Sequence, residues 1–493
     1  MTDLLLGLDV GTTATKAIIF DVHGNIVASA EHGYPLLTPQ PGWVEQDAEE
    51  LWRVVVATIR SVVSQMNPRD RIVALCQSSQ AGTTIPVDAE GQPTYNAISW
   101  MDQRAVEQAE VVKGRFGTEF IHATTGWRLH SGLPLQHIAW LKQNRPECFA
   151  ATRRLFFVND FIGWRLTGNC GTNPSDAGIT QLLNIATGDW DDRLLECAGV
   201  KREQLSPVLP SGCIVGHVTM AVSQATGLPE NLPVINGAHD QYCAAVGAGV
   251  TLPGQVLLSC GTAWVLLCVP PSSKVGLRSG MAVSRHAVPG RWGAIRSLGG
   301  VGRSLEWLLD NVWGGRAAGE KRALLYDTIS EAARQSSAGA NGLLFSPPAG
   351  GHAAKSVSGA FVGLTLSHSR DDLARAVMEG IAFELRWAIE EIRAAGVQVS
   401  ELNMVGGAAK SAMWTRIVAD VTGVPVILPA IKQAASLGAA ILAGVGIGVF
   451  ANAESGFAAM RGAPTLLTPA VETRQRYDQV FASYRHFCEL LSR

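Results

Sequence analysis

The residues near the N-terminus that are best suited to chemistry are Asp9, Gly11, Thr12, Thr13 and Lys16. Backbone N–H groups and threonine hydroxyls of such a turn can donate to phosphate oxygens, and glycine lets the backbone approach a ligand closely. An aspartate beside them suits Mg²⁺, which prefers oxygen ligands, and the lysine would offset phosphate charge. The segment indicates a phosphate-binding turn with a metal-binding carboxylate, although turn chemistry in an ordinary hairpin explains it as well.

A second Gly-Thr pair, Gly261 and Thr262, lies in the middle of the chain between two apolar runs. It has the same setting as the first turn, with a run of apolar residues on either side. Two such turns facing each other would hold a triphosphate from both sides. Neither turn matches the G-x-x-x-x-G-K-[ST] or G-x-G-x-x-G fingerprints of other nucleotide-binding folds.

Asp240 follows the apolar segment 232–235 and precedes a run of small residues. We interpret residues 232–242 as a strand, a tight turn and the start of a helix. The Asp240 carboxylate could accept a proton from a hydroxyl that attacks phosphorus, a reaction that otherwise needs mainly positioning and charge neutralisation. It could instead cap the following helix. His239 is more typical of a packing or hydrogen-bonding residue than of a base.

Gly406, Gly407 and Ala408 end an apolar segment and precede a predicted helix. A glycine turn between a strand and a helix can lay flat backbone against an adenine or a ribose. A plain strand-to-helix connection is the alternative interpretation, and the segment alone does not decide between the two.

The elements that must position these residues alternate between strand and helix patterns, which favours an α/β class. Residues 4–20 predict an antiparallel meander, and 254–268 repeat its strand, Gly-Thr turn and strand about 250 residues later. Residues 371–395 predict a helix with a capping box at Ser369 and Asp372. Residues 434–450 are shorter than the ~20 residues of a membrane span, so we interpret them as a buried helix.

The composition excludes several classes of protein. The chain has 493 residues, 47% of them hydrophobic, and a net charge of −2 from 40 basic and 42 acidic residues. Global disorder and generic nucleic-acid binding are therefore disfavoured. Nine cysteines without a C-x-x-C pair disfavour a disulfide framework or zinc site. With no secretory signal at the N-terminus, we expect a cytoplasmic protein.

Taken together and in order, these motifs resemble the FGGY carbohydrate kinases across essentially the whole chain. The strongest matches are the Asp-x-Gly-Thr-Thr opening, the central Gly-Thr turn, Gly-Ala-His-Asp-Gln at 237–241 and Gly-Gly-Ala-Ala-Lys-Ser-x-x-Trp at 406–414. Further matches lie at 42–47, 100–104, 160–168, 342–347 and 436–440.

The resemblance implies an α/β fold with two actin-like (ribonuclease-H-like) domains flanking a deep catalytic cleft. Residues 1–248 would form the sugar-binding side and residues 249–493 the ATP-binding side. It implies ATP and Mg²⁺ as cofactors, a small-molecule sugar as substrate and a homodimer, with no nucleic acid or membrane partner. Asp240 would be the catalytic base and Asp9 the metal ligand. The cofactor would contact Gly11, Thr12, Thr13, Lys16, Gly261, Thr262, Gly406, Gly407 and Ala408, and the sugar Gln80, Ala81, Gly82, Trp100, Asp102, Asp240 and Gln241.

Within the family the chain is most similar to xylulokinases, which convert D-xylulose to D-xylulose 5-phosphate. Those enzymes place a sugar-contacting histidine where this chain has Gly82, and glycerol kinases place Arg-Glu where it has Ala81 and Gly82. Two small residues predict a roomier pocket, and His130 could supply a replacement contact. Kinases for ribulose, sedoheptulose or gluconate remain alternatives. So do a non-catalytic actin-like ATP switch and a sugar-binding regulator.

Overall fold

The computed structural model describes residues 3–67, 69–313, 315, 319–348, 352 and 359–491. Their contacts divide the chain into two compact units. The first comprises Met1–Thr251, Val269–Ala294 and Gln433–Gly462, and the second Leu252–Cys268, Ile295–Lys432 and Ala463–Arg493. The chain thus leaves each unit and returns to it. The predicted domains, residues 1–248 and 249–493, differ from these two units because the units are defined by contacts alone. The division after residue 248 stays a prediction.

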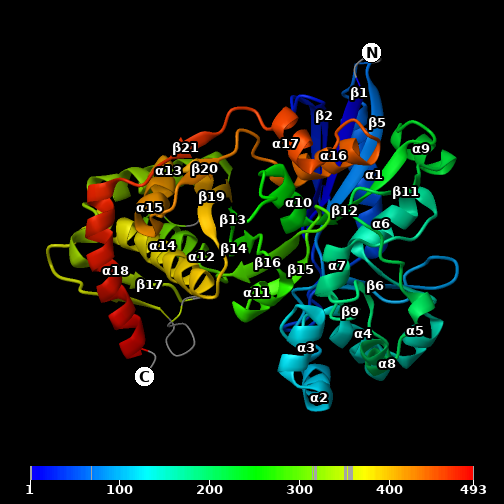
Figure 1. Cartoon of the computed structure of the whole chain (residues 1–493), viewed down its shortest axis with the longest axis horizontal. Helices are drawn as coiled ribbons and strands as arrows, with labels where there is room; N and C mark the ends of the chain where they lie inside the picture. The colour runs from blue at the N-terminus through cyan, green and yellow to red at the C-terminus, as the bar shows by residue number, and fades with distance from the viewer. Residues whose placement is uncertain are drawn as a thin grey trace. The chain divides into compact units, whose positions relative to one another are not determined.

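The first unit is built on a six-stranded sheet of order β11-β12-β5-β1-β2-β3 (Figure 1). β1 pairs antiparallel with β2 and parallel with β5, and β5 pairs parallel with β12. Because the apolar run Leu4–Leu6 is fully buried, this strand can lie in the centre of a sheet that helices cover. The sheet strands are β1 (Asp3–Val10), β2 (Ala14–Asp21), β3 (Ile26–Gly33), β5 (Arg71–Ser79), β11 (Ile214–His217) and β12 (Pro233–His239).

Helices α10 and α16 pack against each other and against this sheet so closely that glycine is required at the contacts. A Cβ on Gly7 would lie 2.0 Å from the Ser436 carbonyl oxygen, and one on Gly438 would lie 1.8 Å from that of Cys243. The helices of the unit are α1 (Ala48–Val63), α2 (Val106–Phe116), α3 (Thr118–Thr125), α4 (Pro134–Asn144), α5 (Pro146–Ala151), α6 (Val158–Thr167), α7 (Pro174–Ile179), α8 (Asp192–Ala198), α9 (Met220–Thr226), α10 (Asp240–Gly247), α11 (Ser273–Arg278), α16 (Ala434–Gly446) and α17 (Ala453–Met460).

A smaller four-stranded sheet of order β4-β7-β6-β8 supports the loops of the first unit. Its strands are β4 (Glu45–Gln46), β6 (Thr84–Val87), β7 (Ala97–Ile98) and β8 (Arg154–Phe157). The remaining strands of the unit are β9 (Leu183–Asn184), β10 (Asp189–Trp190) and β15 (Ala282–Arg285), and β16 (Trp292–Ser297) spans the change from the first unit to the second.

The second unit repeats the arrangement of the first. β13 pairs antiparallel with β14 and parallel with β19, as β1 does with β2 and β5. The sheet continues to β20 and β21. The elements of the unit are β13 (Gly254–Cys260), β14 (Trp264–Cys268), α12 (Arg303–Leu308), α13 (Gly319–Gln335), β17 (Leu344–Ser346), β18 (Ala360–Val362), α14 (Arg370–Ala394), β19 (Val399–Gly406), α15 (Ala412–Thr422), β20 (Val426–Leu428), β21 (Thr465–Leu467) and α18 (Val471–Leu491).

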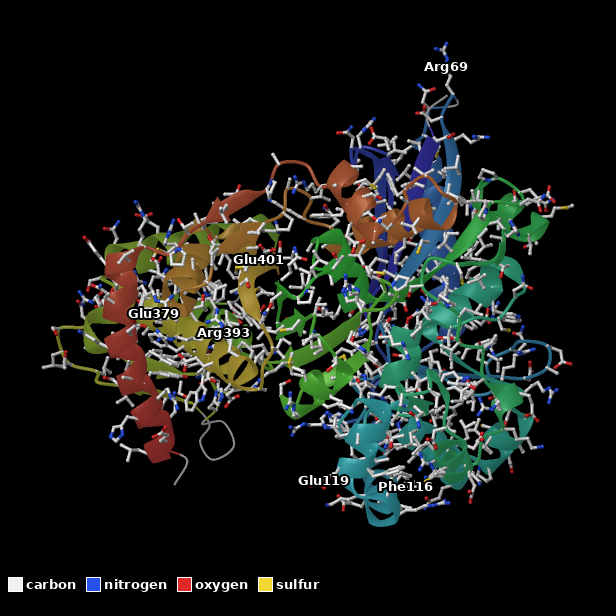
Figure 2. All side chains as sticks on the ribbon, viewed as in Figure 1. Arg69, Phe116, Glu119, Glu379, Arg393 and Glu401 are labelled. Atoms are coloured by element: carbon white, nitrogen blue, oxygen red, sulfur yellow. The ribbon has the colours of Figure 1, made fainter. Side chains whose placement is uncertain are left out.

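Buried polar contacts join α14 to the terminal helix α18. Glu379, labelled in Figure 2, accepts hydrogen bonds from the Tyr477 hydroxyl at 2.7 Å and from Arg375 Nε at 2.6 Å. The predicted capping box of Ser369 and Asp372 starts α14 as expected. These contacts hold the long helix in a single orientation within its unit, because a buried charged group is costly unless it is paired.

Most of the predicted elements are confirmed, and one is wrong. The antiparallel meander, its repeat and the buried helix after residue 433 are present. The tight turn predicted between strand and helix within 236–242 is absent, because β12 continues to His239 and passes directly into α10. A shift of register between Ile235 and Ala238 absorbs the small residues there. All nine cysteines are free thiols. No helix among the described residues is long and apolar enough to cross a membrane.

Candidate active site

Three parallel strands of the first unit end at the same edge of its sheet. Asp9 of β1 lies opposite Ser78 of β5, and His239 of β12 lies opposite Ser79. Asp240 is the next residue along the chain, at the first position of α10. The predicted metal ligand Asp9 and the predicted base Asp240 are therefore brought to one edge of one sheet, although 231 positions of sequence separate them.

The surroundings of the Asp9 carboxylate suit a bound divalent cation. Its Oδ1 accepts a hydrogen bond from Ser78 Oγ at 2.8 Å. Burial, and then repulsion from Asp240, raise the pKa of Asp9 to about 7. These two effects outweigh the hydrogen bond from Ser78 and the attraction of Lys16, which lower the pKa. A divalent cation would relieve the repulsion between two neighbouring carboxylates. No group of three or more His, Cys, Asp or Glu that could hold a metal occurs among the described residues, but Mg²⁺ usually takes only one or two carboxylates plus water and phosphate. The residues present fit such an ion.

The Gly11–Thr13 turn is held in place by side chains from other segments. Gln46 Nε2 donates to the Thr12 carbonyl at 2.8 Å, Trp100 Nε1 donates to Thr12 Oγ1 at 3.1 Å, and the Tyr34 hydroxyl donates to the Gly11 carbonyl. The Thr13 side of the turn remains exposed. A turn fixed in this way can present backbone N–H groups to a phosphate without reorganisation.

Lys16 is not directed at this turn in the structure. Its ammonium pairs with Glu31 of β3 at 3.0 Å, and both side chains are substantially exposed. A contact between Lys16 and phosphate stays a prediction that requires this exposed pair to open. Exposed ion pairs contribute little to stability, so opening it would cost little.

The Asp240 carboxylate is partly exposed, at 33% for the side chain, and its Oδ1 lies 3.0 Å from His239 Nε2. The pair is close enough for an ion pair, but it is not aligned as a hydrogen bond, and that oxygen has no hydrogen-bond partner. The alternative in which Asp240 caps α10 does not hold, because the cap position belongs to His239. The neighbouring Gln241 also has a buried Oε1 without a partner. Buried polar atoms without partners indicate a place where a ligand binds.

The predicted sugar-side residues 80–82 are packed more tightly than their sizes suggested. Gln80 is buried and donates to Gln46 Oε1 at 3.0 Å, and Ala81 is buried in a small apolar cluster with Leu133 and Ile179. Gly82 has φ +81°, and a Cβ on it would lie 3.2 Å from the Trp100 Cβ. Neighbouring side chains therefore occupy the space next to the Gly82 Cα, and the roomier sugar pocket stays a prediction.

Trp100 and Asp102 have different surroundings. Trp100 is 44% exposed and presents its ring beside the Thr12 turn. Asp102 is fully buried, and its two oxygens accept hydrogen bonds from Arg104 Nε at 2.9 Å, Arg104 Nη2 at 2.8 Å and the Val44 amide at 2.6 Å. Arg104 also pairs with buried Glu45 at 2.7 Å. Asp102 thus has its hydrogen-bonding capacity taken up by the protein, and its direct contact with sugar stays a prediction.

His130 lies next to the Trp100 loop. Its Nδ1 accepts a hydrogen bond from the Gly132 amide at 3.0 Å. Gly132 packs so closely that a Cβ on it would lie 2.7 Å from the Trp100 carbonyl oxygen. The structure thus brings this exposed histidine to the same group of loops as Trp100.

The second unit contains a cavity of about 540 Å³ at the ends of β13 and β19. Gly261, Thr262, Gly407 and Ala408 line it, as predicted for the nucleotide contacts. Gly406 does not line the cavity, but its φ of +95° sets the turn, and the Gly407 amide donates to the Cys260 carbonyl at 2.9 Å. The cavity is also lined by Cys260, Trp264, Gly302, Leu305, Glu306, Gly319, Arg322, Ala323, Tyr326, Asp327, Ser330, Lys410, Ser411 and Trp414.

Several of these residues were not found from the sequence. Arg322, Tyr326 and Asp327 come from α13, whose only sequence signal is helical periodicity. In the first unit, Asp176 interacts electrostatically with both His239 and Asp240. Its sequence signal is an Asn-Pro pair that starts α7, which predicts a helix start but not what the helix packs against.

Comparison with known proteins identifies the same family, the FGGY carbohydrate kinases, along most of the chain. Residues 4–247 match the N-terminal domain of the FGGY family of carbohydrate kinases, and residues 256–447 match its C-terminal domain. The xylulose kinase of Bacillus subtilis is 29% identical over 487 residues, covering 98% of this chain and 96% of that protein. An autoinducer-2 kinase of Yersinia enterocolitica is 31% identical over 467 residues, covering 91% and 87%.

Among solved structures, a xylulose kinase from Rhodospirillum rubrum superposes with a TM-score of 0.90 at 27% identity, covering 99% of each chain. The strand arrangement repeated in the two units is that of the actin-like, two-domain α/β fold of these kinases. Because the two family domains together match most of the sequence, the chain belongs to the FGGY family of carbohydrate kinases.

Proposed function

We propose that this sugar kinase transfers the γ-phosphoryl group of ATP to the terminal hydroxyl of D-xylulose, giving D-xylulose 5-phosphate. The observation that carries the mechanism is the partly exposed Asp240 carboxylate, which begins α10 at the sheet edge where Asp9 also lies. The choice of sugar is supported by the likeness to xylulose kinases over nearly the whole length of the chain.

In this mechanism Asp240 accepts the proton of the sugar hydroxyl as that oxygen forms its bond to the γ-phosphorus. The bond between the γ-phosphorus and the oxygen that bridges to the β-phosphate breaks, and ADP leaves with that oxygen. Trp100 would hold the sugar, and the Gly11–Thr13 turn would donate to phosphate. The protein's contribution is mostly orientation and charge stabilisation.

The cavity of the second unit would take the nucleoside. Its backbone at Gly407 and Ala408 offers a flat surface, and Trp264 and Trp414 supply an aromatic wall with ring centroids 5.3 Å apart. Its volume of about 540 Å³ lies within the usual range of ligand sites. A divalent cation held through Asp9 would neutralise charge on the triphosphate.

Two other functions compete with this one. A kinase for another ketose or for a sugar acid such as gluconate would use the same Asp240 and the same nucleotide site. A non-catalytic ATP switch would bind nucleotide but would release no ADP in response to sugar. The packed surroundings of Gly82 favour a sugar whose contacts come from Trp100 and His130 rather than from residue 82.

A coupled ADP-release assay with a panel of substrates tests the proposal. The purified protein is measured with MgATP and D-xylulose, L-xylulose, D-ribulose, sedoheptulose, gluconate, autoinducer-2 or glycerol. We expect kcat/KM to be highest for D-xylulose. A higher value for another sugar would replace the proposed substrate, and the absence of any sugar-dependent ADP release would favour the switch. The predicted homodimer is measured in the same preparation by light scattering.

A further inference from the structure

His239 touches the proposed base from a position that the protein fixes on several sides. Its Nε2 lies 3.0 Å from Asp240 Oδ1, and its side chain is only 11% exposed. Its backbone N–H donates to Ser175 Oγ at 3.0 Å, which ties the end of β12 to α7. The fixed backbone at His239 and the burial of its side chain therefore hold the imidazole next to Asp240.

A second carboxylate lies close to this imidazole. Asp176 on α7 is almost fully buried, and its Oδ2 accepts a hydrogen bond from Asn173 Nδ2. Its Oδ1 and His239 Nδ1 are both buried without a hydrogen-bond partner. Burial alone lowers the pKa of His239, but the charges of Asp240 and Asp176 outweigh it and raise the pKa above its usual value. The surroundings of His239 therefore favour an imidazole with N–H groups on both nitrogens.

Aromatic packing restricts the ring further. The His239 and Tyr242 rings have centroids 5.8 Å apart at 42°. Tyr242 is fully buried and donates its hydroxyl to the Gly293 carbonyl at 3.1 Å, and His286 also contacts its ring at a centroid distance of 5.7 Å. His239 is thus part of a rigid cluster, whereas Asp240 faces partly outward.

We propose that His239 is a positioning residue for Asp240: its imidazole, held near Asp176, fixes Asp240 Oδ1 and so aims Oδ2 at the sugar hydroxyl. This inference rests on the proposed function of Asp240. The present contact is close but poorly aligned, as catalytic hydrogen bonds often are before substrate binds. Without the imidazole the carboxylate could rotate about its side-chain bonds, and a misplacement of about 1 Å can cost about 10²-fold in rate.

The test compares two replacements that differ in reach. In His239→Gln the amide nitrogen can take the place of Nε2, whereas in His239→Asn it reaches only the place of Nδ1. We expect His239→Gln to retain most of the parent kcat, and His239→Asn and His239→Leu to lower kcat by about 10²-fold with little change in the KM for sugar. A purely structural role would make Gln and Asn equally harmful, and that result would overturn the inference.

Two further measurements separate positioning from packing. His286→Leu removes the second imidazole that packs against Tyr242, and we expect it to leave kcat close to that of the parent. An equal loss in His286→Leu and His239→Leu would assign the effect to the aromatic cluster and overturn the inference. The melting temperature of each variant shows whether it is folded. If His239→Leu does not fold, the kcat values of His239→Gln and His239→Asn decide whether His239 positions Asp240.

A double variant separates this inference from the proposed function. Because His239 acts through Asp240, adding His239→Leu to Asp240→Asn should cause little further loss of kcat. A full additional loss would overturn the inference. If Asp240→Asn alone keeps the parent kcat, the proposed base is wrong. If Asp240→Asn is inactive while His239→Leu is fully active, only the inference about His239 fails.

Discussion

Asp9 and Asp240 are both carboxylates, but their surroundings suit different roles. Burial and the nearby Asp240 make the charged form of Asp9 costly, which suits a site that a cation completes. Asp240 stands at the start of α10 with a third of its side chain exposed, which suits a base that must meet a substrate. One strand register brings both to the same edge.

The first prediction concerns the base. Asp240→Asn keeps the size of the side chain but cannot accept the sugar proton, so we expect kcat to fall by about 10²–10⁴-fold. Nucleotide affinity, measured by calorimetry with ADP, should be unchanged because the cavity lined by Gly407 lies in the second unit. Turnover close to that of the parent in a coupled assay would remove Asp240 from the mechanism.

The second prediction concerns Gly82. A side chain there must adopt a positive φ and also press on Trp100, whereas a Cβ on Gly168, where φ is +78°, would have no neighbouring atom within 4 Å. Both Gly82→Ala and Gly168→Ala should lose about 1–2 kcal/mol of stability from backbone strain. Only Gly82→Ala should also raise the KM for sugar, because it displaces Trp100. Equal KM values for the two variants would mean that Trp100 does not contact the sugar.

At the scale of elements, a buried ion cluster holds the Trp100 loop against β4 and β7. Arg104 pairs with Asp102 and Glu45, and its guanidinium lies 3.8 Å from the centroid of the Trp43 ring. All three charged side chains are almost completely buried. The cluster replaces regular secondary structure as the means of fixing a loop that carries a candidate sugar contact.

The third prediction follows from this cluster. Arg104→Leu leaves two carboxylates buried without their cation, so we expect a loss of about 3–5 kcal/mol in the free energy of unfolding measured with urea. Arg53→Leu, which breaks the exposed pair with Glu50, is the control and should change stability far less. A loss no larger than that of the control would show that the cluster does not stabilise the loop.

At the scale of the whole molecule, one strand arrangement occurs twice and carries different chemistry each time. In the first unit the turn after β1 follows Asp9, and in the second the turn after β13 follows Ser259 at the same position of the repeat. The first copy thus has a carboxylate at this position, and the second has a neutral residue next to a cavity. This difference agrees with the proposal that the first unit holds the cation and the second the nucleoside.

The fourth prediction concerns pH and overall stability. Burial raises the pKa of Asp160 from 3.8 to about 7, even though Ser206 Oγ and the Phe157 amide donate to it. Since the folded state holds this proton more tightly than the unfolded state, the stabilisation is complete below about pH 4 and is lost as the pH rises through about 7.

Asp160→Asn removes this dependence because the amide does not ionise. We expect the melting temperature of the variant, relative to the parent, to rise between pH 4 and pH 7 and then to level off. The buried Asp9 is common to both proteins, so its contribution cancels in the comparison. If the difference in melting temperature between variant and parent stays constant from pH 4 to pH 7, the pKa of Asp160 is the same in the folded and unfolded states.

The amino-acid sequence by itself determined the α/β class, the repeated meander, the caps of α14 and the family, because those features depend on neighbouring residues or on motifs in a fixed order. It also selected Asp9, Asp240 and the glycine turns as candidates. It failed at the tight turn predicted within 236–242, where the strand continues to His239, and it did not show that Trp100 packs beside Gly82.

Only the tertiary structure decided which candidates meet. It brought Asp9 and Asp240 to one edge of the sheet and placed His239 next to Asp240. It also paired Lys16 with Glu31 and Asp102 with Arg104. The physical reason is that local patterns report the conformation of a few adjacent residues. Contacts across the sheet join residues far apart in sequence, and their geometry depends on strand register and packing, which no short segment encodes.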